Sequence, residues 1–529
     1  MLRNVLAGYV ETLRERDFDI PLLCILLKNE FFDIHFLHGA FEFGKDFIAK
    51  KQEGDKIIQY VFQSKGGNIG LADFGQVRWQ LEEARMNPIA HPSFNTEIER
   101  RVVLVTTGRL VGGASASAQT YKKWCLEHGN MGFQVWDVDY LLGMMLKEGA
   151  NPYGLIEENP EFLSMVVNMK QGKGTFKEIE QYSRIWFEKC RNGTKRSYFG
   201  AVLESAIFAY ELKNTGRTLL ACYVSLFPIR AIVHALHEKN EGLPRWIHEV
   251  FHLIHDHFLC CSENLIETLM KYKEEDESIF NRHIGGVHVF VAYPVICSQS
   301  MEILGLAGLL KLRRNEMEKA KEIGNLLATL LEKNSGFFSP ISDRFAVSMI
   351  PAVILLHEFD RNEVIRSLIS RTAIWLCNRY EISELGLASS YAAEEDEINT
   401  LLGYAYDFIK LPARRESYLG TVLIDLTAIL GLNDLYEDIL NDILAVEILP
   451  CNIVTKDTVD KYMLNGASVY TPVIRFKDSL SSERAWRDGV EEEAEETFCL
   501  KNDMWWELLA IISILRDRHF VNELSAIVS

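Results

Sequence analysis

The sequence lacks the features that mark several classes of protein. No apolar run has the roughly 20 residues needed to cross a bilayer, and the chain begins without the basic stretch and apolar run of a signal peptide. The ten cysteines are scattered and form no CxxC pair, so disulfides are not needed. These absences predict a cytoplasmic protein with reduced thiols and no membrane partner.

Positive charge is scarce as well. The 56 Lys and Arg residues face 74 Asp and Glu residues, which gives a formal net charge of −18 at pH 7. This balance argues against broad, non-specific binding of nucleic acid. However, residues 1–150 carry 17 basic and 19 acidic side chains, so most of the acidic excess lies further along the chain. A nucleic-acid enzyme of this composition needs a local basic groove or a partner.

A chain of 529 residues is too long for a single hydrophobic core, and its pattern divides it into three parts. Over residues 1–150, strand-like runs alternate with helical ones, which predicts an α/β domain with helices on both faces of a sheet. Over residues 151–449, long helical patterns recur without a strict repeat period, which predicts an all-α solenoid or bundle that senses or scaffolds. Residues 450–529 are predicted to form an irregular C-terminal region with a closing helix at 505–515.

The most informative pattern lies at residues 41–67. Asp46 precedes an apolar, strand-like run, and a turn containing Gly54 and Asp55 separates this run from a second strand that ends at Lys65. Side chains on a strand alternate between its two faces, so Gln63 and Lys65 share a face. If the two strands pair, Asp46 faces Gln63 and Lys65 at one end of a sheet.

These side chains suit metal-assisted hydrolysis of a phosphodiester bond. A hard cation such as Mg²⁺ prefers oxygen ligands, and here the candidates are the Asp46 carboxylate, the Gln63 side-chain oxygen and the Ser64 carbonyl. A lysine near the ion stabilises the charge that develops on the phosphate oxygens. We therefore interpret Lys65 as a catalytic lysine and Mg²⁺ or Mn²⁺ as the cofactor.

An acid on one strand, followed by acid-x-Lys on the next, resembles the pattern of the PD-(D/E)xK, or restriction-endonuclease-like, nuclease superfamily. In this chain the pattern is Asp46 followed by Gln63-Ser64-Lys65. The glutamine in place of the second acid is similar to the QxK variants of the Mrr-like branch. The resemblance covers roughly the first 150 residues and implies a restriction-endonuclease-like α/β fold for them.

The replaced acid leaves the ligand set incomplete, and two other glutamates are candidates to supply the charge. Glu42 lies on the same predicted strand as Asp46, but four residues of straight strand separate the two by roughly 13 Å. It reaches the same metal only if the chain bends, for example at Gly44. Glu30, at the end of a helix predicted over 22–32, is the alternative.

The resemblance implies an enzyme that cleaves DNA, with RNA as the less favoured substrate. By analogy with similar fusions, it also implies a bacterial restriction or anti-phage defence effector, whose helical region regulates it, forms homo-oligomers or binds a protein partner. Arg78 and Arg85, on a helix predicted over 71–86, are candidates to reach phosphates. A catalytically inactive protein that binds nucleic acid or a partner is the alternative, with Gln63 as the mark of a decayed site.

A second motif indicates a different chemistry. His248-Glu249-Val250-Phe251-His252 matches HExxH, in which two histidines on one helix face bind zinc and the glutamate acts as general base. The sequence offers no HExxHxxGxxH spacing for a third ligand. A zinc metalloprotease is therefore the weaker alternative, set against a structural histidine cluster between helices.

Overall fold

The computed structural model describes residues 2–37, 46–86, 91–128, 132–146, 159–191, 193–239, 244–273, 288–403, 415–451, 474–480, 486–487 and 504–528. The chain forms two compact units. The first unit comprises Met1–Gly174, Glu188–Tyr210 and Pro244–Leu253, and the second comprises Thr175–Phe187, Glu211–Leu243 and Ile254–Ser529. These bounds differ from the predicted divisions near residues 150 and 450.

The first unit contains a mixed five-stranded sheet, which confirms the predicted N-terminal α/β domain at this level. Its strands are β1 (Phe31–Phe36), β2 (Phe47–Glu53), β3 (Lys56–Lys65), β4 (Arg100–Thr106) and β5 (Gly132–Trp136). They lie side by side in chain order. β1, β2 and β3 pair antiparallel, whereas β3, β4 and β5 pair parallel.

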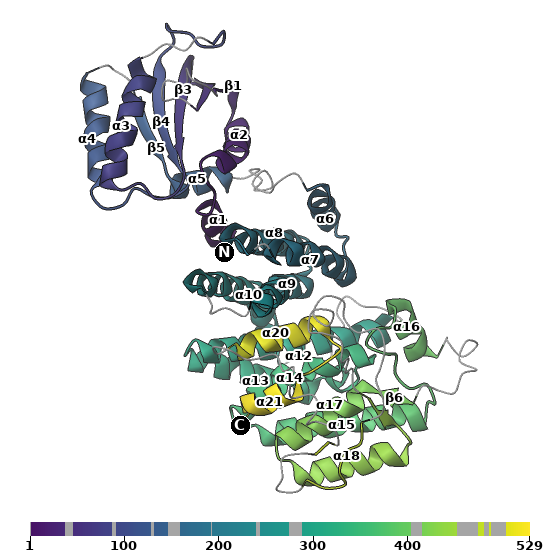
Figure 1. Ribbon diagram of the computed structural model, residues 1–529. Coiled ribbons are helices and arrows are strands. Elements are labelled where there is room, and N and C mark those ends of the chain that lie inside the picture. The colour runs from purple at the N-terminus through teal and green to yellow at the C-terminus, as the bar shows by residue number, and fades with distance from the viewer. Residues whose placement is uncertain are drawn as a thin grey trace. The chain divides into compact units, whose positions relative to one another are not determined.

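Helices cover both faces of this sheet, as predicted. α3 (Leu71–Met86) and α4 (Ala114–Glu127) connect the parallel strands and lie together on one face (Figure 1). Their apolar stripes enclose a core with the inward side chains of the strands, among them Phe74, Leu81 and Val61. α2 (Asp19–Lys28) packs beside β1 on the other face, and α5 (Val138–Met145) packs against β5.

A two-residue turn fixes how β2 and β3 pair. Gly54 takes a positive φ of 59° as the first residue of the turn, a conformation that glycine adopts without steric cost. Glu53 then pairs with Lys56, and the register continues to Phe47 opposite Phe62.

The helix predicted over 22–32 begins and ends earlier in the structure. α1 spans Leu2–Val10, and a short 3₁₀ helix, η1, spans Arg16–Phe18. α2 ends at Lys28, so Glu30 lies outside the helix predicted to carry it. Glu30 has a positive φ of 65° and immediately precedes β1.

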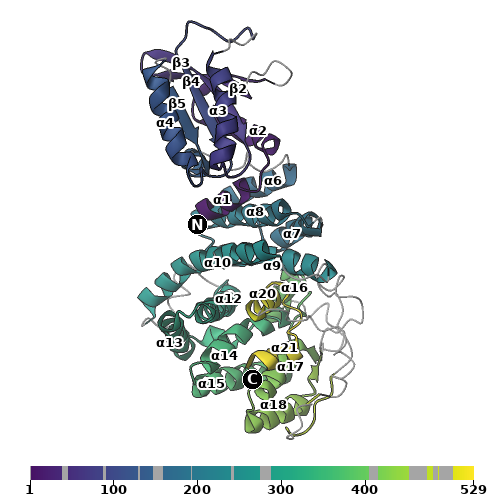
Figure 2. The same ribbon diagram turned by 60° about the vertical axis from the view of Figure 1, so that its left-hand side comes forward.

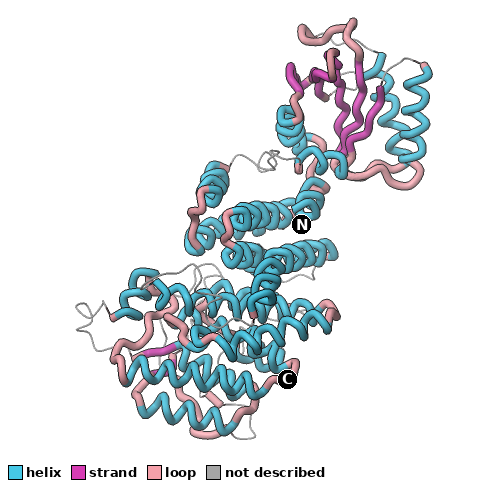
Figure 3. Tube along the Cα trace, turned by 180° about the vertical axis from the view of Figure 1, so that it is seen from behind, coloured by secondary structure: helices cyan, strands magenta, loops and turns pink. Residues whose placement is uncertain are grey.

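A large helical region follows the sheet, as the sequence predicts (Figure 3). Its longer helices are α6 (Pro160–Lys170), α7 (Phe176–Arg191), α8 (Lys195–Asn214), α9 (Thr218–Lys239), α10 (Arg245–Tyr272), α12 (His288–Arg313), α13 (Met317–Lys333), α14 (Ile350–His357), α15 (Asn362–Glu381), α16 (Glu394–Leu402), α17 (Tyr418–Ile429) and α18 (Asn433–Ala445). The 3₁₀ segments η3 (Ser335–Phe338) and η4 (Asp343–Met349) lie between them, and the two-residue strands β6 (Glu416–Ser417) and β7 (Leu449–Pro450) pair parallel.

The C-terminal helices belong to the core of the second unit rather than to a separate region. α20 (Trp505–Leu515) packs on α9 and α12, and α21 (Val521–Val528) packs on α17 (Figure 2). The Trp506 indole Nε1 donates a hydrogen bond to the Leu306 carbonyl at 2.9 Å. The chain end thus completes the packing of helices that precede it by about 200 residues.

The second unit buries an unusual number of charged side chains. Glu302 on α12 is fully buried, and its Oε2 accepts a hydrogen bond of 2.8 Å from Arg516. Asp425 on α17 is also fully buried, where it accepts from Arg487 at 2.7 Å and from His519 at 2.8 Å. A buried charge is tolerated only when it is paired and hydrogen-bonded, so the C-terminal residues supply the partners that these acids need.

Among the described residues, two helices have the length and hydropathy of membrane spans, contrary to the expectation that no apolar run is long enough. They are Thr218–Leu236 in α9 and Val289–Arg313 in α12, with mean hydropathies of 1.8 and 1.5. Buried residues make up 83% and 61% of the two apolar windows. Core helices of a large helical unit pass the same test because they are apolar on most sides.

α12 and α14 approach each other closely at two glycines of α12. A Cβ atom at Gly305 would lie 2.5 Å from the carbonyl carbon of Pro351. A Cβ atom at Gly308 would lie 2.8 Å from the Cδ1 atom of Leu355. The absence of side chains at these glycines is what permits the contact.

We expect Gly305→Ala to destabilise the second unit by roughly 2 kcal/mol, because the added methyl group meets backbone that cannot rotate away. Thermal unfolding followed by circular dichroism would report a lower midpoint. Gly420→Ala in α17 is the matched control, since its Cβ would lie 3.5 Å from Ile443 Cδ1, an ordinary contact. A Gly305→Ala protein as stable as the Gly420→Ala control would contradict the close contact.

Candidate active site at the end of strand β3

The structure brings Asp46 and Gln63 together, as the strand pattern predicts. Asp46 extends β2 by one position, since its amide donates to the Phe62 carbonyl at 2.8 Å. The Oδ2 atom of its carboxylate accepts two hydrogen bonds, one of 2.8 Å from Gln63 Nε2 and one of 2.6 Å from the Ser64 amide. These bonds fix the carboxylate beside the end of β3.

The Gln63 amide leaves one polar atom unsatisfied. Gln63 is 3% exposed. Its Nε2 atom faces Asp46, to which it donates, so its Oε1 atom points away from that carboxylate. Gln63 Oε1 is buried and has no hydrogen-bond partner among the described residues. A buried acceptor without a partner costs about 1–3 kcal/mol. A cation or a water molecule would satisfy it.

Lys65, the last residue of β3, lies on the same face and makes an ion pair that the sequence did not predict. Its Nζ atom is 3.3 Å from both carboxylate oxygens of Glu15. Glu15 immediately precedes η1. The segment is held there because the Thr107 hydroxyl donates to the Leu13 carbonyl at 3.2 Å. Gly66 leaves room for it, since a Cβ at Gly66 would lie 2.9 Å from the Glu15 nitrogen.

Glu42 and Glu30 are the two glutamates that the sequence offers to complete the metal site. Glu42 lies outside the described residues. Glu30 is not brought to the site, because its neighbour Phe31 pairs with Lys51, whereas Leu37 is bonded to Asp46. At about 3.3 Å per residue, the length of β2 therefore places roughly 20 Å between Glu30 and Asp46. Among the described residues, Glu15 is the acidic side chain that reaches Lys65.

The side chains at this end of the sheet fit one hard cation better than two. The charged groups are the carboxylates of Asp46 and Glu15 and the ammonium of Lys65, so the net charge of the three side chains is −1. Gln63 Oε1 adds an oxygen without a partner. The described residues contain no group of three His, Cys, Asp or Glu side chains placed to hold a metal. Any ion here would therefore rely on amide, backbone carbonyl and water oxygens as well as carboxylate.

A second polar cluster lies on the same face of the sheet. Lys50, four residues along β2 from Asp46, donates to Asp33 Oδ2 at 2.6 Å, and His35 Nε2 lies 2.7 Å from Asp33 Oδ1. The hydrogen bond from Lys50 lowers the pKa of Asp33 to about 2. No pattern in the sequence indicates this cluster, because a β-bulge and the positive φ of Asp33 bring these side chains together.

Basic side chains around the site are largely paired. Arg85, expected to reach phosphates, is buried and bonded to Glu82 at 3.1 Å. Arg78 is exposed and lies over the Tyr121 ring. Arg14, beside Glu15, is exposed as well. Arg14, Arg16 and Arg78 are thus exposed arginines near the sheet that are accessible to a phosphate.

Comparisons of the chain with protein-family models, with curated proteins and with solved structures give no match. The interpretation of the site therefore rests on the residues and geometry described above.

The HExxH motif does not form a zinc site among the described residues. His248, Glu249 and His252 all lie on the exposed side of α10, and Glu249 pairs with Lys195 at 3.2 Å. No third ligand joins them, since no group of metal-binding side chains is found in the described part of the chain. The buried histidines of α10 are instead His255 and His257.

His257 is buried without a hydrogen bond, and this makes a pH-dependent prediction. Neither ring nitrogen has a partner among the described residues. Burial lowers the pKa of His257 to about 3, so the folded protein keeps the ring neutral where the unfolded chain takes up a proton. The second unit should therefore lose stability as the pH falls from about 6.5 toward 3.

We expect His257→Leu to stabilise the second unit at pH 7 and to stabilise it further at pH 5, by an additional amount on the order of 2 kcal/mol. Chemical denaturation at the two pH values would measure this difference. His248→Leu, an exposed position on the same helix, is the control and should change stability little at either pH. Equal pH dependence in the native and His257→Leu proteins would contradict the assignment.

Proposed function

We propose that the N-terminal domain is a metal-dependent endonuclease that hydrolyses the phosphodiester bonds of DNA. The observation that carries this proposal is the Asp46 carboxylate, bonded to Gln63 and Ser64 at the end of β3, with Lys65 following on the same face. This is the arrangement expected from the resemblance to the Mrr-like QxK nucleases. The mixed sheet with helices on both faces is compatible with a restriction-endonuclease-like fold.

A cation would be held by the Asp46 carboxylate, Gln63 Oε1 and the Ser64 carbonyl. When bound, Mg²⁺ or Mn²⁺ would polarise the phosphate and lower the pKa of a coordinated water. The residues of the chain perform the remaining tasks. Two hydrogen bonds orient Asp46 before any ligand arrives. The Lys65 ammonium stabilises negative charge that develops on the phosphate oxygens.

Glu15 acts in this proposal as a positioning residue. Its two equal distances to Lys65 Nζ hold the ammonium at the end of β3. Glu15 therefore acts on the lysine and is not one of the residues that would hold the cation.

The whole chain has a formal net charge of −18, so binding of DNA requires positive side chains that are exposed near the site. Arg14 and Arg78 are exposed and suited to contact phosphates. RNA is the less favoured substrate. The helical region would regulate the nuclease, form homo-oligomers or bind a protein partner, as in a bacterial restriction or anti-phage defence effector in the cytoplasm.

A catalytically inactive protein that binds nucleic acid or a partner is the second candidate. The ion pair between Lys65 and Glu15 favours it, since this pair occupies the lysine. The lack of a three-ligand group among the described residues also favours it.

We expect the native chain to cleave plasmid DNA with Mg²⁺ or Mn²⁺ and Lys65→Ala to lose at least about 100-fold of this rate, because the ammonium acts on charge that develops during the reaction. Chelation of the metal should abolish cleavage. Lys56→Ala is the matched control, because Lys56 is exposed at the opposite end of the same strand.

Binding of Mn²⁺, measured by calorimetry, separates the two candidates. Binding that is lost in Asp46→Asn, together with cleavage, would support the nuclease. If the native chain neither binds Mn²⁺ nor cleaves DNA, the result favours the inactive protein. Equal cleavage by native and Lys65→Ala chains would place the activity elsewhere.

Glu15→Gln should lower the cleavage rate about tenfold, because the amide no longer holds the Lys65 ammonium in place, a loss equivalent to about 1.4 kcal/mol. Mn²⁺ binding through Asp46 should persist in this variant. Glu11→Gln is the control, since Glu11 is an acidic residue of the same segment that pairs with Arg109 instead. An unchanged rate in Glu15→Gln would refute the positioning role.

A further inference from the structure

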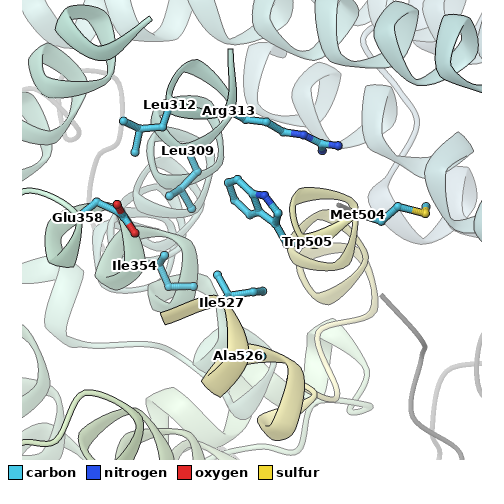
Figure 4. A pocket seen from close by; sticks show the side chains of 9 residues that line it. All are labelled: Leu309, Leu312, Arg313, Ile354, Glu358, Met504, Trp505, Ala526 and Ile527. Carbon is cyan, nitrogen blue, oxygen red and sulfur yellow. The ribbon is translucent and has the colours of Figure 1, made fainter. Parts of the chain in front are cut away.

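A cavity of about 500 Å³ lies within the second unit, where four helices meet. We call it the C-terminal pocket. Its walls come from the end of α12, from α14, from the start of α20 and from α21 (Figure 4). The lining residues are Leu309, Leu312, Arg313, Ile354, Glu358, Met504, Trp505, Ala526 and Ile527. The volume lies within the range of small-molecule sites, about 300–1,000 Å³.

Most of the lining is apolar. Leu309 and Ile354 are buried and form the wall toward the core, and the Trp505 ring faces them across the cavity (Figure 4). Trp505 is half-buried, so one part of its ring remains accessible. An indole with an open face offers area for an aromatic or cationic group.

The positive side chain of the pocket is already neutralised. Arg313 Nη1 donates to Glu507 Oε2 at 2.7 Å, and the guanidinium lies over the Trp505 ring at 6.0 Å. Glu507 is 1% exposed, and its other oxygen lies 2.8 Å from His255 Nε2. The Arg313–Glu507 pair therefore adds no net charge to the pocket.

The negative side chain of the pocket is not neutralised. Glu358 follows the last turn of α14, and its side chain has no hydrogen bond or ion pair with the described residues. Figure 4 shows its carboxylate on the side of the cavity opposite Arg313. The pocket is thus lined mainly by apolar residues and has at its rim one carboxylate that pairs with no described side chain, a combination that favours a cation over an anion.

We propose that the C-terminal pocket binds a small organic monocation with a flat, mainly apolar body, whose positive group pairs with Glu358 and whose ring system packs against Trp505. A purely apolar ligand would be buried in the pocket without a fixed orientation. In the proposed ligand, Glu358 and the Trp505 indole together fix the position of the positive group. The proposal is independent of nuclease activity, because it uses residues of the helical unit only.

Three fluorescent probes of similar aromatic character test the proposal on the full chain. Berberine is a planar aromatic cation, N-phenyl-1-naphthylamine is neutral, and 1-anilinonaphthalene-8-sulfonate is an anion. We expect saturable binding of one berberine per chain, at least tenfold tighter than binding of the anion. Glu358→Gln should weaken berberine about tenfold and leave the neutral probe unchanged.

Two further variants locate the site and control for charge. Ile354→Trp fills the pocket and should abolish binding of berberine and of the neutral probe. Asp360→Asn removes an exposed carboxylate two residues from Glu358 and should have no effect, since Asp360 has a φ of 55° that asparagine also adopts. Glu358→Gln changes an exposed side chain, so the test stays decisive even if Ile354→Trp fails to fold.

Several results would overturn the proposal. These are the absence of saturable berberine binding, equal affinities for berberine and the anion, and berberine affinity that is unaffected by Glu358→Gln. Tighter binding of the anion that is lost in Arg313→Gln would also overturn it, because Arg313 would then be the residue that selects the ligand.

Discussion

The candidate active site depends on the pairing register of β2 with β3. Because side chains alternate along a strand, a slip of one residue would move Gln63 and Lys65 to the face away from Asp46. The two-residue turn at Gly54 and the apolar pair Phe47–Phe62 set this register. The same strand then pairs parallel with β4 up to its last residue. The N-terminal segment is fastened beside this strand end, so the position of Glu15 follows from the same constraint.

Much of this site could be predicted from the sequence, because its parts are local. Alternation within two neighbouring strands predicts Asp46, Gln63 and Lys65 on one face, and in the structure Asp46 and Gln63 are hydrogen-bonded to each other. Glu15 could not be predicted in this way, since it lies 50 residues from Lys65 and is brought there by tertiary packing. Glu30 is predicted on a helix, but that helix ends at Lys28 and the chain turns through a positive φ.

In the helical region, the positions of helices could be predicted from the sequence, but the contacts between them could not. The closing helix predicted over 505–515, for example, coincides with α20. Charged side chains are expected on the protein surface, yet Glu302 and Asp425 are fully buried. Their partners, Arg516 and His519, lie 214 and 94 residues away, at a separation for which single-sequence patterns carry no signal.

The glycine contact between α12 and α14 gives the C-terminal pocket two walls of unequal stiffness. Backbone meets backbone at Gly305, so these two helices cannot slide past each other without a clash. The opposite wall is held by side chains, and α20 is tied to α12 through the hydrogen bond from the Trp506 indole. α21 contributes Ala526 and Ile527 to the pocket and packs on α17. The α12–α14 wall therefore acts as a fixed template, and a ligand of the pocket has to fit the spacing that these two helices keep.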